Sequence, residues 1–133
     1  MIIDSHTHFG VTNNFYLPEK MLLNAMKKGC ISKAVISNIE GAEFDGFKVA
    51  LSSNKPENQV LINTKTLEIA RKYPGIFYPL VWIMPHSGGV TEDFVNFIDM
   101  NQKSIFGFKI HPFLNNVNFD SHLLEPYFKL AES

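Results

Sequence analysis

The sequence has little cysteine: Cys30 is the only one among 133 residues. A single cysteine excludes an intrachain disulfide, and with it the disulfide-stapled scaffolds of secreted proteins. No apolar run approaches the ~20 residues that a membrane-spanning helix needs. The acidic Asp4 stands where a signal peptide has its basic start. We therefore expect a soluble, cytoplasmic protein that does not contact membranes.

An excess of charge of either sign is also absent. The chain has 12 basic and 13 acidic residues, for a net charge of -1. No global field therefore favours nucleic acid or an anionic surface. Hydrophobic residues make up 45% of the chain, which is enough for one globular core. We expect one domain whose ligand is a small molecule rather than nucleic acid.

Strand and helix patterns alternate four times along the chain. Short runs rich in β-branched and aromatic residues predict the strands. Apolar residues at helical spacing, with caps and stops, predict the helices between them. The predicted strands are residues 1–4, 32–37, 76–84 and 104–110, and the predicted helices begin near Pro18, residue 58, Thr91 and Leu124.

This order predicts an α/β fold with a parallel sheet and right-handed crossovers. The last two predicted strands are apolar on both faces, which is typical of a sheet covered on both sides. One long connection, residues 39–57, follows the second strand and is rich in Gly, Ser and Asn. Such a loop holds substrate contacts in many α/β folds, and an ordinary surface insertion explains it equally well.

Two histidines follow the first strand in MIIDSHTHFG. Because side chains alternate along a strand, Asp4, His6 and His8 are expected on one side, where the two imidazoles can converge. Imidazoles at this spacing can hold a zinc ion at ~2.0–2.1 Å. The alternative is that the pair only caps the strand or bonds a turn.

The fourth strand carries Lys109 and His111 between large apolar residues. The apolar residues should pack on helices, which turns Lys109 and His111 to the other face. A lysine on a covered face is costly unless it is paired, neutral or modified, so Lys109 indicates a function. The alternative is that its stem carries the charge out to solvent. The apolar residues are Phe106, Phe108 and Ile110.

Two further histidines lie outside these motifs. His86 follows the third strand, shares the side of Trp82 and Met84, and also falls at a strand end. His122 precedes the fourth helix and is expected to be an exposed helix-start residue.

The stretches MIIDSHTHFG, RKYPGIFYPLVWIMP, FGFKIHP and LLEPYFKLAES, in this order, span nearly the whole chain. They resemble the first half of a metal-dependent amidohydrolase, of the branch that includes aminocarboxymuconate-semialdehyde decarboxylase. The resemblance implies a (β/α)₈ barrel, a metal-bound water as nucleophile, and His6 and His8 as ligands of a divalent metal. Zinc is the first expectation, and manganese and iron suit two imidazoles as well.

We also expect substrate-binding roles for His86, Lys109 and His111. In some members of the superfamily the corresponding lysine is carboxylated and bridges two metals. In this branch a cation that grips a substrate carboxylate fits better. The expected activity is hydrolysis of a small polar, carboxylated substrate, and non-oxidative decarboxylation is the close alternative.

A complete barrel needs about 250 residues, and this chain supplies four of its eight strand-helix units. We therefore expect residues 1–133 to be the N-terminal half of a metal-dependent hydrolase, inactive by itself because the other ligands and the aspartate base of the family have no counterpart here. A non-catalytic half barrel that binds a ligand or another chain is the alternative. An open sheet with exposed apolar residues such as Ile2, Trp82 and Met84 predicts a homo-oligomer.

Overall fold

The structure is a computed structural model that describes residues 1–45, 47–50 and 58–133. Strands and helices alternate in this part of the chain, as the sequence predicts, with one added strand. The strands are β1 (Ile3–Thr12), β2 (Phe15–Leu17), β3 (Lys33–Asn38), β4 (Phe77–Trp82) and β5 (Gly107–Lys109). The α-helices are α1 (Glu19–Lys28), α2 (Gln59–Lys72), α3 (Glu92–Asn101) and α4 (Glu125–Glu132), and two 3₁₀ turns, η1 (Ile39–Gly41) and η2 (Gln102–Ser104), follow β3 and α3.

The five strands form one mixed sheet in the order β2-β1-β3-β4-β5. The four strands β1, β3, β4 and β5 run parallel, and each lies beside the next one along the chain. The unpredicted β2 turns back after Asn13 and Asn14 and pairs antiparallel with the end of β1. Strand β1 is longer than predicted, and β5 is shorter because η2 occupies the start of its predicted range.

Local capping explains where the helices begin. The side chains of Asn58 and Thr91 accept hydrogen bonds from Val60 N and Phe94 N at the starts of α2 and α3, so each satisfies a backbone donor that the helix leaves free. Pro18 precedes α1. Each of the four helices therefore begins close to its predicted residue.

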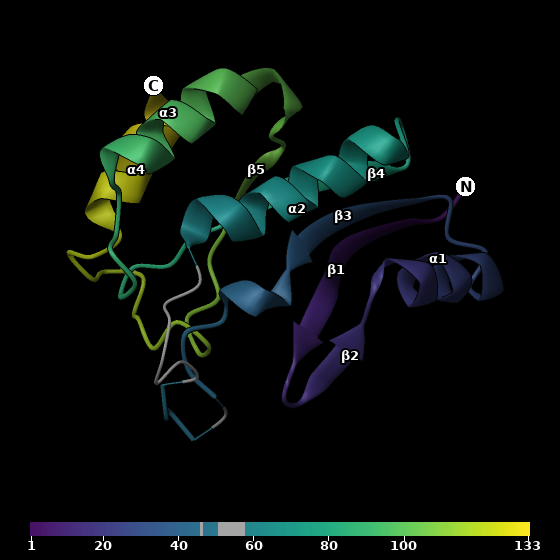
Figure 1. Cartoon of the computed structure of the whole chain (residues 1–133), viewed down its shortest axis with the longest axis horizontal. Helices are drawn as coiled ribbons and strands as arrows, with labels where there is room; N and C mark the ends of the chain where they lie inside the picture. The colour runs from purple at the N-terminus through teal and green to yellow at the C-terminus, as the bar shows by residue number, and fades with distance from the viewer. Residues whose placement is uncertain (46, 51–57) are drawn as a thin grey trace.

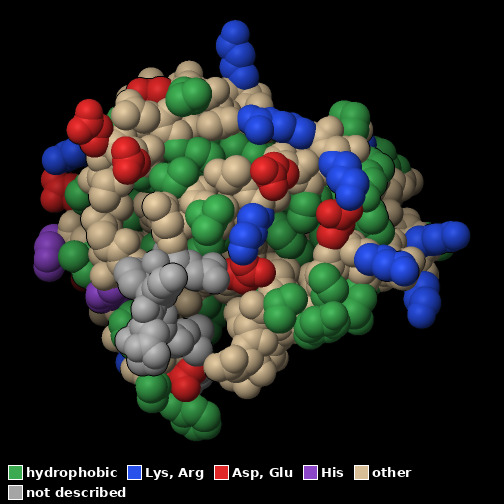
Figure 2. All heavy atoms as spheres, in the orientation of Figure 1, with side chains coloured by type: hydrophobic (Ala, Val, Ile, Leu, Met, Phe, Trp, Pro, Cys, Tyr) green, Lys and Arg blue, Asp and Glu red, His purple; other side chains and the backbone are tan. Residues whose placement is uncertain are grey.

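The α-helices cover one face of the sheet, and α2 lies in front of it in Figure 1. One apolar cluster joins Ala34 and Ile36 of β3 to residues of α1 and α2. A second joins Val81 of β4 and Ile83, which follows that strand, to residues of α2, α3 and α4. Figure 2 views the molecule from this side and shows acidic and basic side chains interspersed over it. Among the described residues no helix has the length and apolar character to cross a bilayer.

The opposite face of the sheet differs from the prediction in two ways. Ile3 of β1 is 49% exposed and Lys109 of β5 is only partly buried on this face, so the sheet is not covered on both sides. Trp82 and Met84 are nevertheless buried, because the residues after β3 pack on them, while Ile2 is 52% exposed. The exposed apolar surface therefore lies at the N-terminal ends of the strands rather than around Trp82.

Candidate functional site

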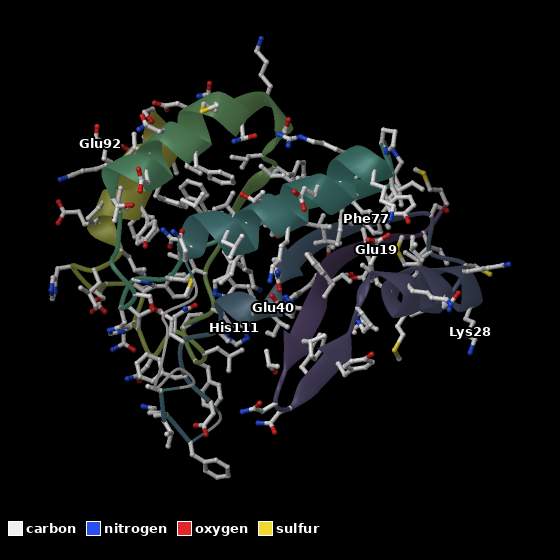
Figure 3. The ribbon with its side chains drawn as sticks, viewed as in Figure 1. Glu19, Lys28, Glu40, Phe77, Glu92 and His111 are labelled. Atoms are coloured by element: carbon white, nitrogen blue, oxygen red, sulfur yellow. The ribbon has the colours of Figure 1, made fainter. Side chains whose placement is uncertain are left out.

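Two imidazoles meet at the C-terminal end of β1. The Nε2 atoms of His6 and His8 lie 3.0 Å apart, and the ring centroids are 4.8 Å apart. His8 stands beside Ser37 of β3 in the parallel register. Figure 3 places His111 near this same end of the sheet and Phe77 near the other end. The predicted convergence of His6 and His8 is therefore present.

The expected position of Asp4 is wrong. The β1–β3 register shifts between Asp4 and Thr7, so β1 carries an extra residue there. Asp4 consequently stands beside Ala34, whose side chain belongs to the helix-covered cluster. Its carboxylate stays local and accepts a hydrogen bond from His6 N at 3.0 Å. A bulge of this kind interrupts the alternation that places side chains on one face.

Ser37 orients His8. The hydroxyl Oγ of Ser37 lies 2.8 Å from His8 Nδ1, and Ser37 is buried. Burial, followed by the nearby Lys109, lowers the pKa of His8 to about 4, so the ring is neutral at neutral pH. A neutral ring that donates Nδ1–H to Ser37 presents the lone pair of Nε2 toward His6. Metal-binding histidines are commonly oriented by such a partner on the other ring nitrogen.

Lys109 and His111 project toward the same face as the histidine pair, as predicted. The Nζ atom of Lys109 lies 2.9 Å from His6 Nε2, and burial lowers the pKa of Lys109. The ring of His111 lies 6.2 Å from that of His8. Leu114 N donates to His111 Nδ1 at 3.2 Å, so a neutral His111 carries its proton on Nε2. Burial, then Lys109, lowers the pKa of His111, which favours this donor form.

The apolar residues in and beside β5 do not all join the helix-covered cluster. Phe108 and Ile110 pack against the cluster that α3 and α4 cover, as predicted. Phe106 does not, because the strand begins only after it. Its ring lies 5.3 Å from Tyr78, and the side chain is 62% exposed.

The ring of Trp82 packs against the imidazoles of His8 and His111. Its ring stacks on His111 at 5.8 Å, with 17° between the planes, and lies 5.4 Å from His8. The Asn63 side chain binds both backbone groups of Trp82: it accepts from Trp82 N at 2.7 Å and donates to Trp82 O at 2.9 Å. These two hydrogen bonds fix the backbone of Trp82 at the end of β4. Strand alternation predicts the face on which Trp82 lies, but no sequence pattern predicts its role in the site.

His86 does not join the cluster of His6, His8, Lys109 and His111. It is exposed, its ring lies 5.2 Å from Phe44, and its Nε2 lies 3.4 Å from the carbonyl of Asn116. The structure therefore gives no support for the predicted substrate contact of His86, because this residue is not part of the cluster. His122 is exposed ahead of α4, as predicted.

A buried carboxylate ties the loops around the site together. Glu43 Oε1 accepts from His86 N, and Oε2 accepts from Asn115 Nδ2, both at 2.8 Å. These bonds join the segments that follow β3, β4 and β5. Burial raises the pKa of Glu43, and the hydrogen bond from Asn115 partly opposes this. No pattern in the sequence pointed to Glu43, because its partners are far away along the chain.

The ligand set for a metal is partial. Within residues 1–45, 47–50 and 58–133, no three His, Cys, Asp or Glu side chains are grouped so that they could hold one ion. His6 and His8 supply two nitrogens, and Lys109 is the nearest further nitrogen. Part of the long connection 39–57, residues 46 and 51–57, lies outside the described residues.

Comparison with known proteins adds little to this geometry. No protein-family model and no curated protein matches the sequence. A crystal structure of Agrobacterium tumefaciens ATU3138, in its apo form, is similar with a TM-score of 0.49 and 12% sequence identity. The similarity covers 88% of this chain, which spans only 39% of that protein. A likeness at this level assigns neither a family nor a function.

Proposed function

We propose that this chain is one half of a (β/α)₈ barrel and holds part of the metal centre of an amidohydrolase-type enzyme. The observation that carries the proposal is the convergence of His6 Nε2 and His8 Nε2 at 3.0 Å, with Lys109 Nζ 2.9 Å from His6. These groups project from the C-terminal ends of parallel strands. Active sites of (β/α)₈ barrels lie at that end.

The topology supports the barrel part of the proposal. The parallel strands follow each other in sequence order, and the α-helices pack on one face. A doubly wound sheet reverses its strand order at one point and carries helices on both faces. A barrel keeps one winding direction and one helix-covered face. The order β1-β3-β4-β5 agrees with the second arrangement.

The two imidazoles fit a metal ion. Two nitrogens bound at ~2.0–2.1 Å to a tetrahedral ion lie roughly 3.3 Å apart, close to the 3.0 Å between His6 Nε2 and His8 Nε2. The low pKa of His8, about 4, keeps its lone pair free, as metal binding requires. The fit is incomplete, since a catalytic zinc site takes three protein ligands.

The chemistry then divides among the residues of the site. A bound divalent metal supplies a water of lowered pKa and polarises the group under attack. His6 and His8 would hold the metal, and the hydroxyl of Ser37 would orient the His8 ring through Nδ1. His111, whose Nδ1 accepts from Leu114 N, would offer its Nε2–H as a donor to the substrate. Lys109 binds a substrate carboxylate, because no carboxylate among the described residues forms an ion pair with it.

Two other functions have an observation behind them. The same lysine would also hold the carboxylate of a substrate that is decarboxylated without oxidation. The incomplete ligand set favours a non-catalytic half barrel that binds a small molecule or another chain.

Metal content tests the proposal. The purified chain is stripped with chelator, loaded with Zn²⁺, Mn²⁺ or Fe²⁺, desalted and measured by elemental analysis. We expect the wild type to retain zinc and the double variant His6→Ala/His8→Ala to lose it. The matched control is His86→Ala/His122→Ala, which removes two exposed imidazoles outside the cluster. Equal metal content in both double variants, or none in the wild type, would contradict the proposal, and circular dichroism checks that each variant is folded.

A further inference from the structure

The rings of Trp82 and His111 are each followed, four residues later, by a group that donates to Glu43. His86 N donates to Oε1 and Asn115 Nδ2 donates to Oε2, both at 2.8 Å. Asn115 is fully buried, and Glu43 is only 8% exposed. One buried carboxylate therefore joins the segment that leads away from Trp82 to the segment that contains His111.

Further hydrogen bonds connect Glu43 to the ring of His111. The carbonyl of Leu114 accepts from Glu43 N at 3.0 Å and from Phe44 N at 2.9 Å. Leu114 N donates to His111 Nδ1 at 3.2 Å, and Asn115 N donates to the carbonyl of His111 at 2.8 Å. The turn from His111 to Asn115 is thus closed on itself, and both its backbone and a side chain bond to the Glu43 segment.

A carboxylate suits this position better than an amide. The groups that bond to the Glu43 side chain are all donors: His86 N, Asn115 Nδ2 and the side chain of Ser87. An ionised carboxylate accepts at both oxygens, whereas an amide accepts at one atom and donates at the other. A buried donor or acceptor without a partner is costly, so the pairing of Glu43 with both segments constrains their relative position.

We propose that Glu43 is a positioning residue, which holds the ring of His111 in its stack on Trp82. The two rings lie 5.8 Å apart, with 17° between their planes. Asn63 already fixes the backbone of Trp82, so the stack depends on how the turn that carries His111 is held. The further step, that this orients Nε2–H of His111 toward a substrate, rests on the proposed function.

An exchange of hydrogen-bond polarity tests the proposal. Asn115→Asp sets a second carboxylate against Glu43 with no donor between them, so the turn should detach. The double variant Glu43→Gln/Asn115→Asp restores the pair in reverse, because the new amide at position 43 accepts from His86 N and donates to the new carboxylate at position 115. The matched control is Asn118→Asp, which adds the same charge at an exposed position of the same segment.

The readout is the nuclear Overhauser contact between the ring protons of Trp82, the only tryptophan, and those of His111, in the purified chain without added metal. The signals of His111 are assigned by their loss in His111→Gln. We expect the contact in the wild type, in Asn118→Asp and in the double variant, and its loss in Asn115→Asp. If Glu43 served only the stability of the fold, a folded Asn115→Asp variant would keep the contact.

Each outcome decides the proposal. A folded Asn115→Asp variant that keeps the contact overturns it, and so does a double variant that fails to regain the contact. If circular dichroism shows that Asn115→Asp does not fold, the double variant decides alone, and a restored contact supports the proposal. None of these measurements depends on metal or substrate. A failure of the proposed metal site therefore leaves the role of Glu43 standing, and loss of that role leaves the metal test unchanged.

Discussion

Replacing Gly41 with Ala tests whether Trp82 is packed as tightly as the geometry requires. A Cβ at Gly41 would lie 2.5 Å from Cδ1 and 2.6 Å from Cγ of Trp82. The backbone of Gly41 is not in the left-handed region, so the conflict is steric rather than conformational. The indole has little room to retreat, because Trp82 is fully buried, its backbone is held by Asn63, and its ring stacks on His111.

The expected magnitude is a net loss of about 2 kcal/mol. Overpacking a dense core costs typically ~1–3 kcal/mol, and a contact this short belongs to the upper part of that range. The substitution also restricts the unfolded chain, which stabilises the folded state by roughly 0.4–1 kcal/mol. With a urea m-value of ~1–3 kcal/mol/M, the unfolding midpoint should fall by about 1 M.

The assay follows the fluorescence of Trp82, the only tryptophan in the chain, through urea unfolding at a fixed protein concentration. Gly107→Ala is the matched control, because its Cβ would meet Leu80 Cδ2 at an ordinary 3.4 Å. We expect the control to unfold within about 0.5 kcal/mol of the wild type. If Gly41→Ala is as stable as the control and has unchanged emission, the reasoning about Trp82 is wrong.

Two further predictions concern the polar residues that support the site. Ser37→Ala removes the partner of His8 Nδ1 and should weaken zinc binding by about 10–100-fold, as loss of such partners typically does. Isothermal titration measures this, with Ser32→Ala as an exposed control, and equal affinities would count against the role of Ser37. Burial raises the pKa of Glu43 above its ordinary 4.5, so its stabilising contribution is complete below that pH and is lost as pH rises through the folded-state pKa. The free energy of unfolding of the wild type should therefore fall relative to that of Glu43→Gln between about pH 5 and about pH 8. Urea unfolding measures both, and a difference that stays constant over this range would rule the prediction out.

Local signals in the sequence predicted most of the fold. Apolar spacing and the cap at Thr91 predicted the helices, and apolar runs predicted β3 and β4 close to their observed bounds, whereas β1 extends to Thr12 rather than Asp4 and β5 is shorter than predicted. The hairpin strand β2 was missed, although Asn13 and Asn14 between two β-forming stretches are a two-residue turn signal. The predicted first strand ends at Asp4, so the prediction contains no strand directly before this turn.

The site was predictable only where spacing alone decides geometry. Each of the pairs His6/His8 and Lys109/His111 lies on one face as predicted, because side chains alternate regularly within each short segment. The prediction fails for Asp4, because the bulge in β1 depends on pairing with β3. Ser37 and Glu43 meet His8 and Asn115 across 29 and 72 residues of sequence. No local pattern specifies such pairs.

The ligands proposed above would complement the arrangement of charge at the site. Three nitrogens, from His6, His8 and Lys109, lie within about one hydrogen-bond length of a neighbour, and the described residues place no carboxylate in an ion pair with Lys109. Burial depresses the pKa of both His8 and Lys109, so folding alone disfavours their charged forms. Such clusters are disfavoured in a core that serves only packing, and they occur where a bound ion or substrate provides the missing charge. A metal cation would accept the imidazole lone pairs and a substrate carboxylate would neutralise the ammonium, so the two ligands together satisfy groups that neither satisfies alone.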